Sequence, residues 1–276
     1  MKIWHRLSFP PAAESTLQKL GLQYKRDYRL NDPNAVLSVF MTIDESNPAW
    51  LAVSELGGGE TEVYTEFSSE EVLSAEWLIV DSHHSIGYPL PRGTSWSTEY
   101  YELGCKSCGV NWRQITPYRV SPKTRMGKYA FASFWGGFQL FCSSGVLEKF
   151  ESEGIRGYDT WPLRLTQAKQ SLPDVRQLII GTVAAPAIVE ETAETKYFAK
   201  HSCSEHGGNW YNYYRRGMLP MWRNALHQGV DFQLTNEWFG NGRTARREIL
   251  VSNRVAQLVF RNQWKGLYLS PVQLID

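Results

Sequence analysis

Two short pairs of metal-binding residue types, almost a hundred positions apart, constrain this chain more than any other feature. Cys105 and Cys108 form the first pair, and Cys203 and His206 form the second with the same spacing. Side chains at positions i and i+3 of a tight turn can converge on one ion. Three cysteines and one histidine complete a closed tetrahedral set for zinc, with no position left for a catalytic water. The sequence therefore predicts one structural zinc ion (Zn2+) per chain, joining two distant segments.

Each pair is followed by a glycine, Gly109 or Gly207, where a positive φ is often required. The second pair matters because a single Cys-x-x-Cys also serves redox thiols. Two alternatives stay open. The first pair can be a redox couple or a vestigial knuckle, and His206 can be an ordinary surface histidine with His201 or a water in the fourth position.

Charge and cysteine usage narrow the class of protein. A net charge of +1 gives no excess positive field for phosphate backbones, so nucleic acid is not the expected partner. Residues 1–10 lack the apolar run of an export signal, and no segment is long and apolar enough to span a membrane. Four cysteines, including a close pair, fit a reducing compartment, so we expect a cytoplasmic protein. Cys142 follows an apolar stretch and is expected to be a small buried hydrophobe.

Helix and loop signals suggest two domains. Ser68 is a good N-cap with Glu71 three residues later, which predicts a helix running through Trp77. Residues 78–80 then read as a buried strand, and the Gly- and Pro-rich stretch 83–96 reads as a linker. We therefore expect an N-terminal α+β module over residues 1–95 and a zinc-linked domain over residues 96–276.

The second domain contains what looks like an internal repeat. The segment from Ser143 to Pro162 aligns without a gap with the segment from Ser252 to Pro271, and each reads as strand, helix, turn and strand. Chance matching of common helix signals is the alternative. The expected fold class is α+β, with a small N-terminal mixed module and a C-terminal portion of two related strand–helix–strand units joined by the zinc site.

Three further stretches have both a functional and a structural interpretation. The stretch 238–247 has the aromatic and arginine content of an interface hot spot, but its aromatics can equally belong to the core. The stretch 81–84, Asp-Ser-His-His, can be a general-base or metal cluster, or a loop with two packed histidines. The stretch 211–216 has the composition of a platform for single-stranded nucleic acid.

Structural tests separate these interpretations. A continuous basic groove would favour nucleic-acid binding, and the residues expected to line it are Arg215, Arg216, Arg243 and Arg246. A deep polar pocket at His83 would favour an enzyme. The sequence has no phosphate-binding glycine loop, no G-x-S-x-G elbow and no H-E-x-x-H helix.

Several stretches carry a family resemblance, namely residues 69–77, 84–89, 105–109, 154–157, 237–242 and 265–268. With these, over most of its length, the chain resembles the bacterial double-CXXCG motif proteins, which are candidate immunity proteins against polymorphic or contact-delivered toxins. It departs from them at His206, where relatives carry a second Cys-x-x-Cys. The resemblance implies a non-enzymatic protein that binds and neutralises a cognate toxin. The alternative function is a zinc-dependent nucleic-acid-binding or regulatory module.

Overall fold

The structure is a computed structural model that describes residues 1–91, 95–135, 138–166, 170–190, 199–213, 216–240 and 245–276. These residues form two compact units. The first unit contains Met1–Ser68 with Arg215–Gly217, and the second contains Ser69–Tyr214 with Met218–Asp276. The predicted division at residues 95 and 96 lies beside residues 92–94, which are outside the described part, and stays a prediction.

The first unit is a four-stranded antiparallel sheet with two short helices, and its strand order is β2-β3-β1-β4. Alternate residues of β1, including Leu7 and Phe9, face a core with the helices, as expected for a strand with one buried face. The elements in chain order are β1 (Lys2–Phe9), η1 (Pro11–Ala13), α1 (Glu14–Lys19), β2 (Lys25–Arg29), β3 (Asp32–Asp44), α2 (Trp50–Ser54) and β4 (Gly59–Glu66).

A group of polar and charged side chains around the buried His5 holds Arg216 within the first unit. His5 is 1% exposed, and its two ring nitrogens lie 2.6 Å from a Glu60 oxygen and 2.7 Å from a Glu45 oxygen. Arg216 donates two hydrogen bonds to the same Glu45 carboxylate, at 2.8 and 3.0 Å. The partly buried ion pair between Arg216 and Glu45 therefore ties this distant piece of chain to the unit.

The second unit begins with α3 (Ser69–Ser74) and β5 (Trp77–Ser82). The predicted helix does start after Ser68, but it ends before Trp77, which instead begins β5. The next elements are α4 (Ser95–Tyr100), β6 (Tyr101–Glu102), β7 (Arg113–Gln114), β8 (Arg119–Val120), β9 (Phe131–Ala132), β10 (Phe141–Ser143), α5 (Ser144–Ser152), β11 (Asp159–Leu165) and β12 (Ser171–Ile179).

The rest of the second unit consists mainly of short strands, with a second nine-residue helix. Its elements are β13 (Lys200–Ser202), β14 (Asn209–Tyr211), β15 (Leu219–Trp222), η3 (Arg223–Ala225), β16 (Phe232–Leu234), β17 (Trp238–Phe239), β18 (Ile249–Ser252), α6 (Asn253–Arg261) and β19 (Leu267–Ile275).

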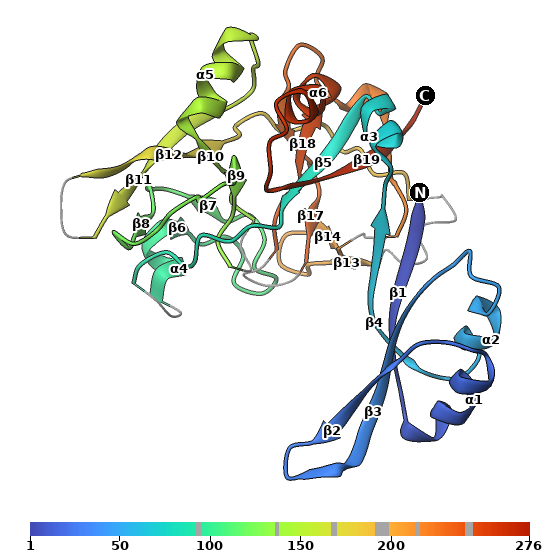
Figure 1. Ribbon diagram of the computed structural model, residues 1–276. Coiled ribbons are helices and arrows are strands. Elements are labelled where there is room, and N and C mark those ends of the chain that lie inside the picture. Colours follow the sequence, from blue (N-terminus) through green and yellow to red (C-terminus); the bar gives the residue numbers. More distant parts are fainter. Residues whose placement is uncertain (92–94, 136–137, 167–169, 191–198, 214–215, 241–244) are drawn as a thin grey trace. The chain divides into compact units, whose positions relative to one another are not determined.

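Two five-stranded sheets form the body of the second unit. The first five-stranded sheet has the order β8-β11-β12-β10-β9, and the second has the order β15-β19-β5-β18-β16. Figure 1 shows β5, in cyan, among the orange and red strands of the second sheet. A strand from the start of the unit therefore lies in the middle of a sheet whose other members come from its end.

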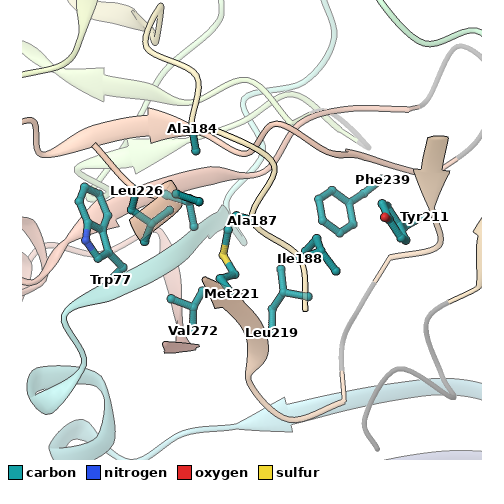
Figure 2. Close-up of a cluster of buried hydrophobic side chains, with 12 residues drawn as sticks. Trp77, Ala184, Ala187, Ile188, Tyr211, Leu219, Met221, Leu226, Phe239 and Val272 are labelled. Carbon is teal, nitrogen blue, oxygen red and sulfur yellow. The ribbon is translucent and has the colours of Figure 1, made fainter. Parts of the chain in front are cut away.

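Buried apolar side chains from distant segments pack around the second five-stranded sheet (Figure 2). Trp77 of β5, Met221 of β15 and Val272 of β19 belong to this cluster, as do Ala187 and Phe239. Burial of apolar surface is the main favourable term in folding, so this cluster ties the early strand β5 to the C-terminal strands.

The expected α+β fold class is wrong. Strand residues outnumber helix residues about two to one, and the described helices α5 and α6, at nine residues each, lie beside five-stranded sheets instead of defining separate strand–helix–strand units. The sequence prediction recognised the two helices from caps and apolar stripes. It missed strands of two or three residues, because alternation over so short a span produces no detectable pattern.

Candidate metal site

The four predicted ligands lie together in the second unit. The donor atoms of Cys105, Cys108, Cys203 and His206 are all within 4.8 Å of one another, which is an arrangement that could hold a metal ion. The Sγ atoms of Cys105 and Cys203 are 3.7 Å apart, and Cys108 Sγ is 3.1 Å from His206 Nε2. The structure thus brings together two pairs from distant parts of the chain.

The backbone of each knuckle explains why its two ligands converge. In the first knuckle, residues 104–110, the N–H of Gly109 donates to Cys105 O at 2.9 Å. In the second knuckle, residues 202–208, the N–H of Gly207 donates to Cys203 O at 2.8 Å. Both glycines have positive φ, 74° and 65°, which a residue with a Cβ adopts only with strain.

The sulfur positions fit a tetrahedral zinc site. Zn–S bonds of about 2.3 Å place two sulfurs about 3.8 Å apart, close to the observed Cys105–Cys203 distance. A sulfur and an imidazole nitrogen should be about 3.6 Å apart, so His206 sits somewhat too near Cys108 and must shift outward slightly on binding. The Gly208 N–H also points at His206 Nδ1, 3.0 Å away. This contact must open as well, because a ring that binds metal through Nε2 carries its proton on Nδ1.

A carboxylate links the two knuckles beside the four donors. Glu205, from the second knuckle, accepts hydrogen bonds from the hydroxyl of Ser107 and, at 3.3 Å, from the thiol of Cys105 in the first. The Ser107 bond is the main cause that lowers the pKa of Glu205. The knuckles are therefore held against each other by protein contacts as well as by their shared donor set.

Burial and backbone donors affect the thiols differently. Burial raises the pKa of the Cys108 thiol to about 11, whereas the backbone N–H of Glu205 lowers the pKa of the Cys203 thiol. Because metals bind the thiolate, uptake of an ion at neutral pH must displace a proton from Cys108.

Aromatic residues pack against the three cysteines. Trp238 and Ala245 are buried with Cys108 and Cys203, and Trp112 packs against the same cluster. The indoles of Trp112 and Trp238 meet edge to face with centroids 5.6 Å apart. An apolar shell of this kind limits the access of water to a metal site.

Sequence reasoning missed the two tryptophans that complete this shell, although a signal for them exists. The first knuckle continues as Gly109-Val-Asn-Trp112, and the second continues as Gly207-Gly-Asn-Trp210. Trp112 and Trp210 both pack against the donor cluster. Comparing the knuckles beyond their ligands would have revealed the matching Asn-Trp pairs.

Asp81, His83 and His84 each contact a different neighbour. The Asp81 carboxylate faces Arg246, 3.5 Å away, and the ring of His84 stacks on Tyr129 with centroids 3.7 Å apart. Burial lowers the pKa of His84, and its Nε2 atom is buried without a hydrogen-bond partner. His83 is exposed and packs beside Tyr268. Packed loop histidines describe this segment better than a general base.

The proposed nucleic-acid contacts are engaged in the protein interior. Arg216 is bound by Glu45, and Arg246 is 11% exposed with its guanidinium between Asp81 and Glu248. The hydroxyl of Tyr211 donates to Glu190 at 2.6 Å, and its side chain is buried. Arg215 and Arg243 lie outside the described residues.

The stretch 238–247 is part of the core where the structure describes it. Trp238 is 9% exposed and Phe239 is 1% exposed, while residues 241–244 lie outside the described part. Arg247 stacks on Trp238, 5.3 Å from the ring centroid. Cys142 is fully buried in β10, and burial raises the pKa of its thiol, in agreement with the role of a small hydrophobe.

Comparison of the sequence with models of known protein families and with curated proteins finds no match. Among the described helices, none is both long and apolar enough to cross a membrane.

Proposed function

We propose that this chain is a non-enzymatic, immunity-type protein that binds and neutralises a cognate toxin in the cytoplasm, and that one zinc ion joins its two knuckles. The closed group of four donors carries the metal part of this proposal. Three sulfurs and one ring nitrogen complete a tetrahedron around zinc, which leaves no open position for substrate or water and so favours a structural role.

The toxin-neutralising part is supported by the resemblance to double-CXXCG proteins. The described residues are compatible with it in one respect. In the stretch 81–84, the candidate for a general base, the side chains are packed or ion-paired. His84 stacks on Tyr129, and Asp81 faces Arg246.

The metal proposal is tested by elemental analysis of the purified protein. We expect about one zinc per chain, as a closed four-ligand site requires. His206→Ala should lower the zinc content, whereas the matched variant His201→Ala should not, because His201 hydrogen-bonds Asn212 at 3.0 Å and is not among the four donors. Absence of zinc from the unmodified protein, or its loss in His201→Ala alone, would overturn the ligand assignment.

The toxin proposal is tested in cells by expressing the reading frame next to the gene for this chain, with and without the protein. We expect the neighbour to arrest growth when expressed alone and growth to return on co-expression. The same co-expression is repeated with Cys203→Ser in place of the unmodified protein. This substitution removes a buried donor and leaves the charge of the surface unchanged. A harmless neighbour, or a toxic one that the protein does not restrain, would contradict the proposal.

A further inference from the structure

The two five-stranded sheets of the second unit are built on one plan. Reading across each sheet, β8, β11, β12, β10 and β9 correspond to β15, β19, β5, β18 and β16. In both sheets the first two strands pair in parallel and every later pair is antiparallel. Ten strands in two sheets agree in order and direction. The correspondence includes β10, α5 and β11 with β18, α6 and β19, which are the segments aligned as a repeat in the sequence.

The second unit has two halves, a first half that ends after β11 and a second half that begins with β12. In each sheet, one strand comes from the half that does not supply the other four. β5, at the start of the unit, is the middle strand of the second sheet, whose other four strands lie between residues 219 and 275. β12, which begins the second half, is the middle strand of the first sheet, whose other four strands lie between residues 119 and 165. Each half of the chain therefore gives its first strand to the sheet of the other.

The hydrogen bonds that follow the exchanged strands also correspond. Beyond β5, the N–H of Ile86 donates to Ser133 O at 3.0 Å, and beyond β12, the N–H of Ala184 donates to Leu234 O at 2.9 Å. Ser133 directly follows β9, and Leu234 is the last residue of β16, the strand that corresponds to β9. The correspondence thus extends past the strands into the loops.

Two glycines mark a close crossing of the halves. A Cβ on Gly157 would lie 2.3 Å from Phe232 O, and a Cβ on Gly266 would lie 2.1 Å from Phe131 O. Phe232 begins β16 of the second sheet, and Phe131 begins β9 of the first. In each case the turn after a helix of one half touches the edge strand of the other half, so the contact is reciprocal.

The knuckles obey the same relation, because each half supplies one. The N–H of Cys105 donates to Val110 O at 2.9 Å, and the N–H of Cys203 donates to Gly208 O at 3.0 Å. The candidate metal site therefore lies where equivalent pieces of the two halves meet.

We infer that the second unit is an internal pseudo-dimer, in which two halves of the chain exchange their first strands and neither half forms a complete sheet alone. The partner that each half fits is the other half. Each exchanged strand pairs on both sides with strands of the other half, β12 with β10 and β11, and β5 with β18 and β19. The two reciprocal glycine contacts join the halves in addition. Removing the metal then loosens the knuckles, but the halves remain joined by the sheets.

The inference is tested by cutting the full chain between the halves. A protease recognition sequence is inserted between Leu165 and Gln170, in the connection from β11 to β12, and the purified protein is cleaved. We expect the two pieces to elute together at the size of the intact chain, both before and after treatment with a chelator, and to separate in denaturant. Separation of the pieces on cleavage, or on chelation alone, would overturn it.

Cross-linking gives a second measurement on the same cleavable chain. Cys142 on β10 lies opposite Arg176 on β12. In a Cys203→Ser background the second piece contains no cysteine, so Arg176→Cys adds the only one. Oxidation should then join the two pieces covalently, because facing residues on paired strands are close enough for a disulfide.

The matched control for cross-linking adds Cys142→Ser to Arg176→Cys, and we expect the covalent product to disappear. Without strand exchange, β12 would pair with β18 and Arg176 would lie opposite Val251, as Leu78 of β5 does in the structure. Pieces that stay separate on a non-reducing gel, or a product that does not depend on Cys142, would contradict the exchange.

Discussion

The two knuckles have nearly the same backbone but different second ligands. Each turn is closed by the same pair of backbone hydrogen bonds and followed by a glycine of positive φ. Cys108 is 5% exposed and packs with Val110, whereas His206 is exposed and is followed by Gly208. Two of the differences lie at the second ligand and at the residue two positions beyond it.

This pairing has a steric reason. A Cβ on Gly208 would lie 2.6 Å from His206 Nδ1 and 2.7 Å from its Cε1, too close for carbon. The equivalent residue of the first knuckle, Val110, carries a branched side chain because the smaller Cys108 leaves room for it. Backbone bonds and glycines thus set the turn, and the space beside the second ligand decides whether that ligand can be a ring.

Loss of the ion shared by both knuckles is the change expected to lower stability most. We expect Cys203→Ser to abolish metal binding and to lower the free energy of unfolding of the second unit by several kcal/mol, because the metal couples segments that are distant in sequence. Metal content and thermal unfolding measure this. Cys142→Ser is the control, since Cys142 is buried outside the site. An unchanged melting curve for Cys203→Ser would show that the metal contributes nothing to stability.

The pairing of ligand and neighbour can be tested by exchanging both. Gly208→Val alone should push the ring of His206 off the donor cluster and weaken metal binding about tenfold or more, which corresponds to about 1.4 kcal/mol. Combining it with His206→Cys gives the second knuckle the ligands and spacing of the first, and should restore binding. Competition with a chromogenic chelator measures both affinities. If the double variant binds no better than Gly208→Val, the steric explanation is wrong.

The smallest expected effect tests the equivalence of the two backbones. Gly109→Ala and Gly207→Ala should each cost about 1 kcal/mol, because alanine at positive φ is strained. A Cβ on Gly207 would meet no other atom within 4 Å, so at that position strain is the only cost. Denaturant unfolding measures the loss in stability. Losses that differ by severalfold would mean that the two turns are not equivalent.

Much of the candidate site could be predicted from the sequence, because its signal is local. Cysteine pairs with a following glycine identify a knuckle wherever the fold places them, and the four residues do cluster. The helices α5 and α6 also lie within the two aligned segments and begin directly after Ser143 and Ser252, although neither serine makes a side-chain capping hydrogen bond. Ligand spacing and caps act over a few residues, so short-range patterns identify them.

The sheets could not be predicted in the same way. β5 was recognisable as an apolar strand, but nothing in residues 77–82 indicates that its neighbours are β18 and β19. Short strands such as β9 and β17, at two residues each, have no periodicity to read. The same limit applies to Glu205, whose contact with Ser107 depends on how the knuckles face each other.

By itself, the sequence determined the donor set, the knuckle turns and the starts of the main helices, since each depends on residues within one turn of chain. Only the tertiary structure decided which sheet each central strand joins, that Trp238 is buried, and that Arg246 faces Asp81 and Glu248. The physical reason is that strand pairing and burial are contacts between distant segments. Their free energy depends on how the whole chain shares its apolar surface, which a local pattern does not record.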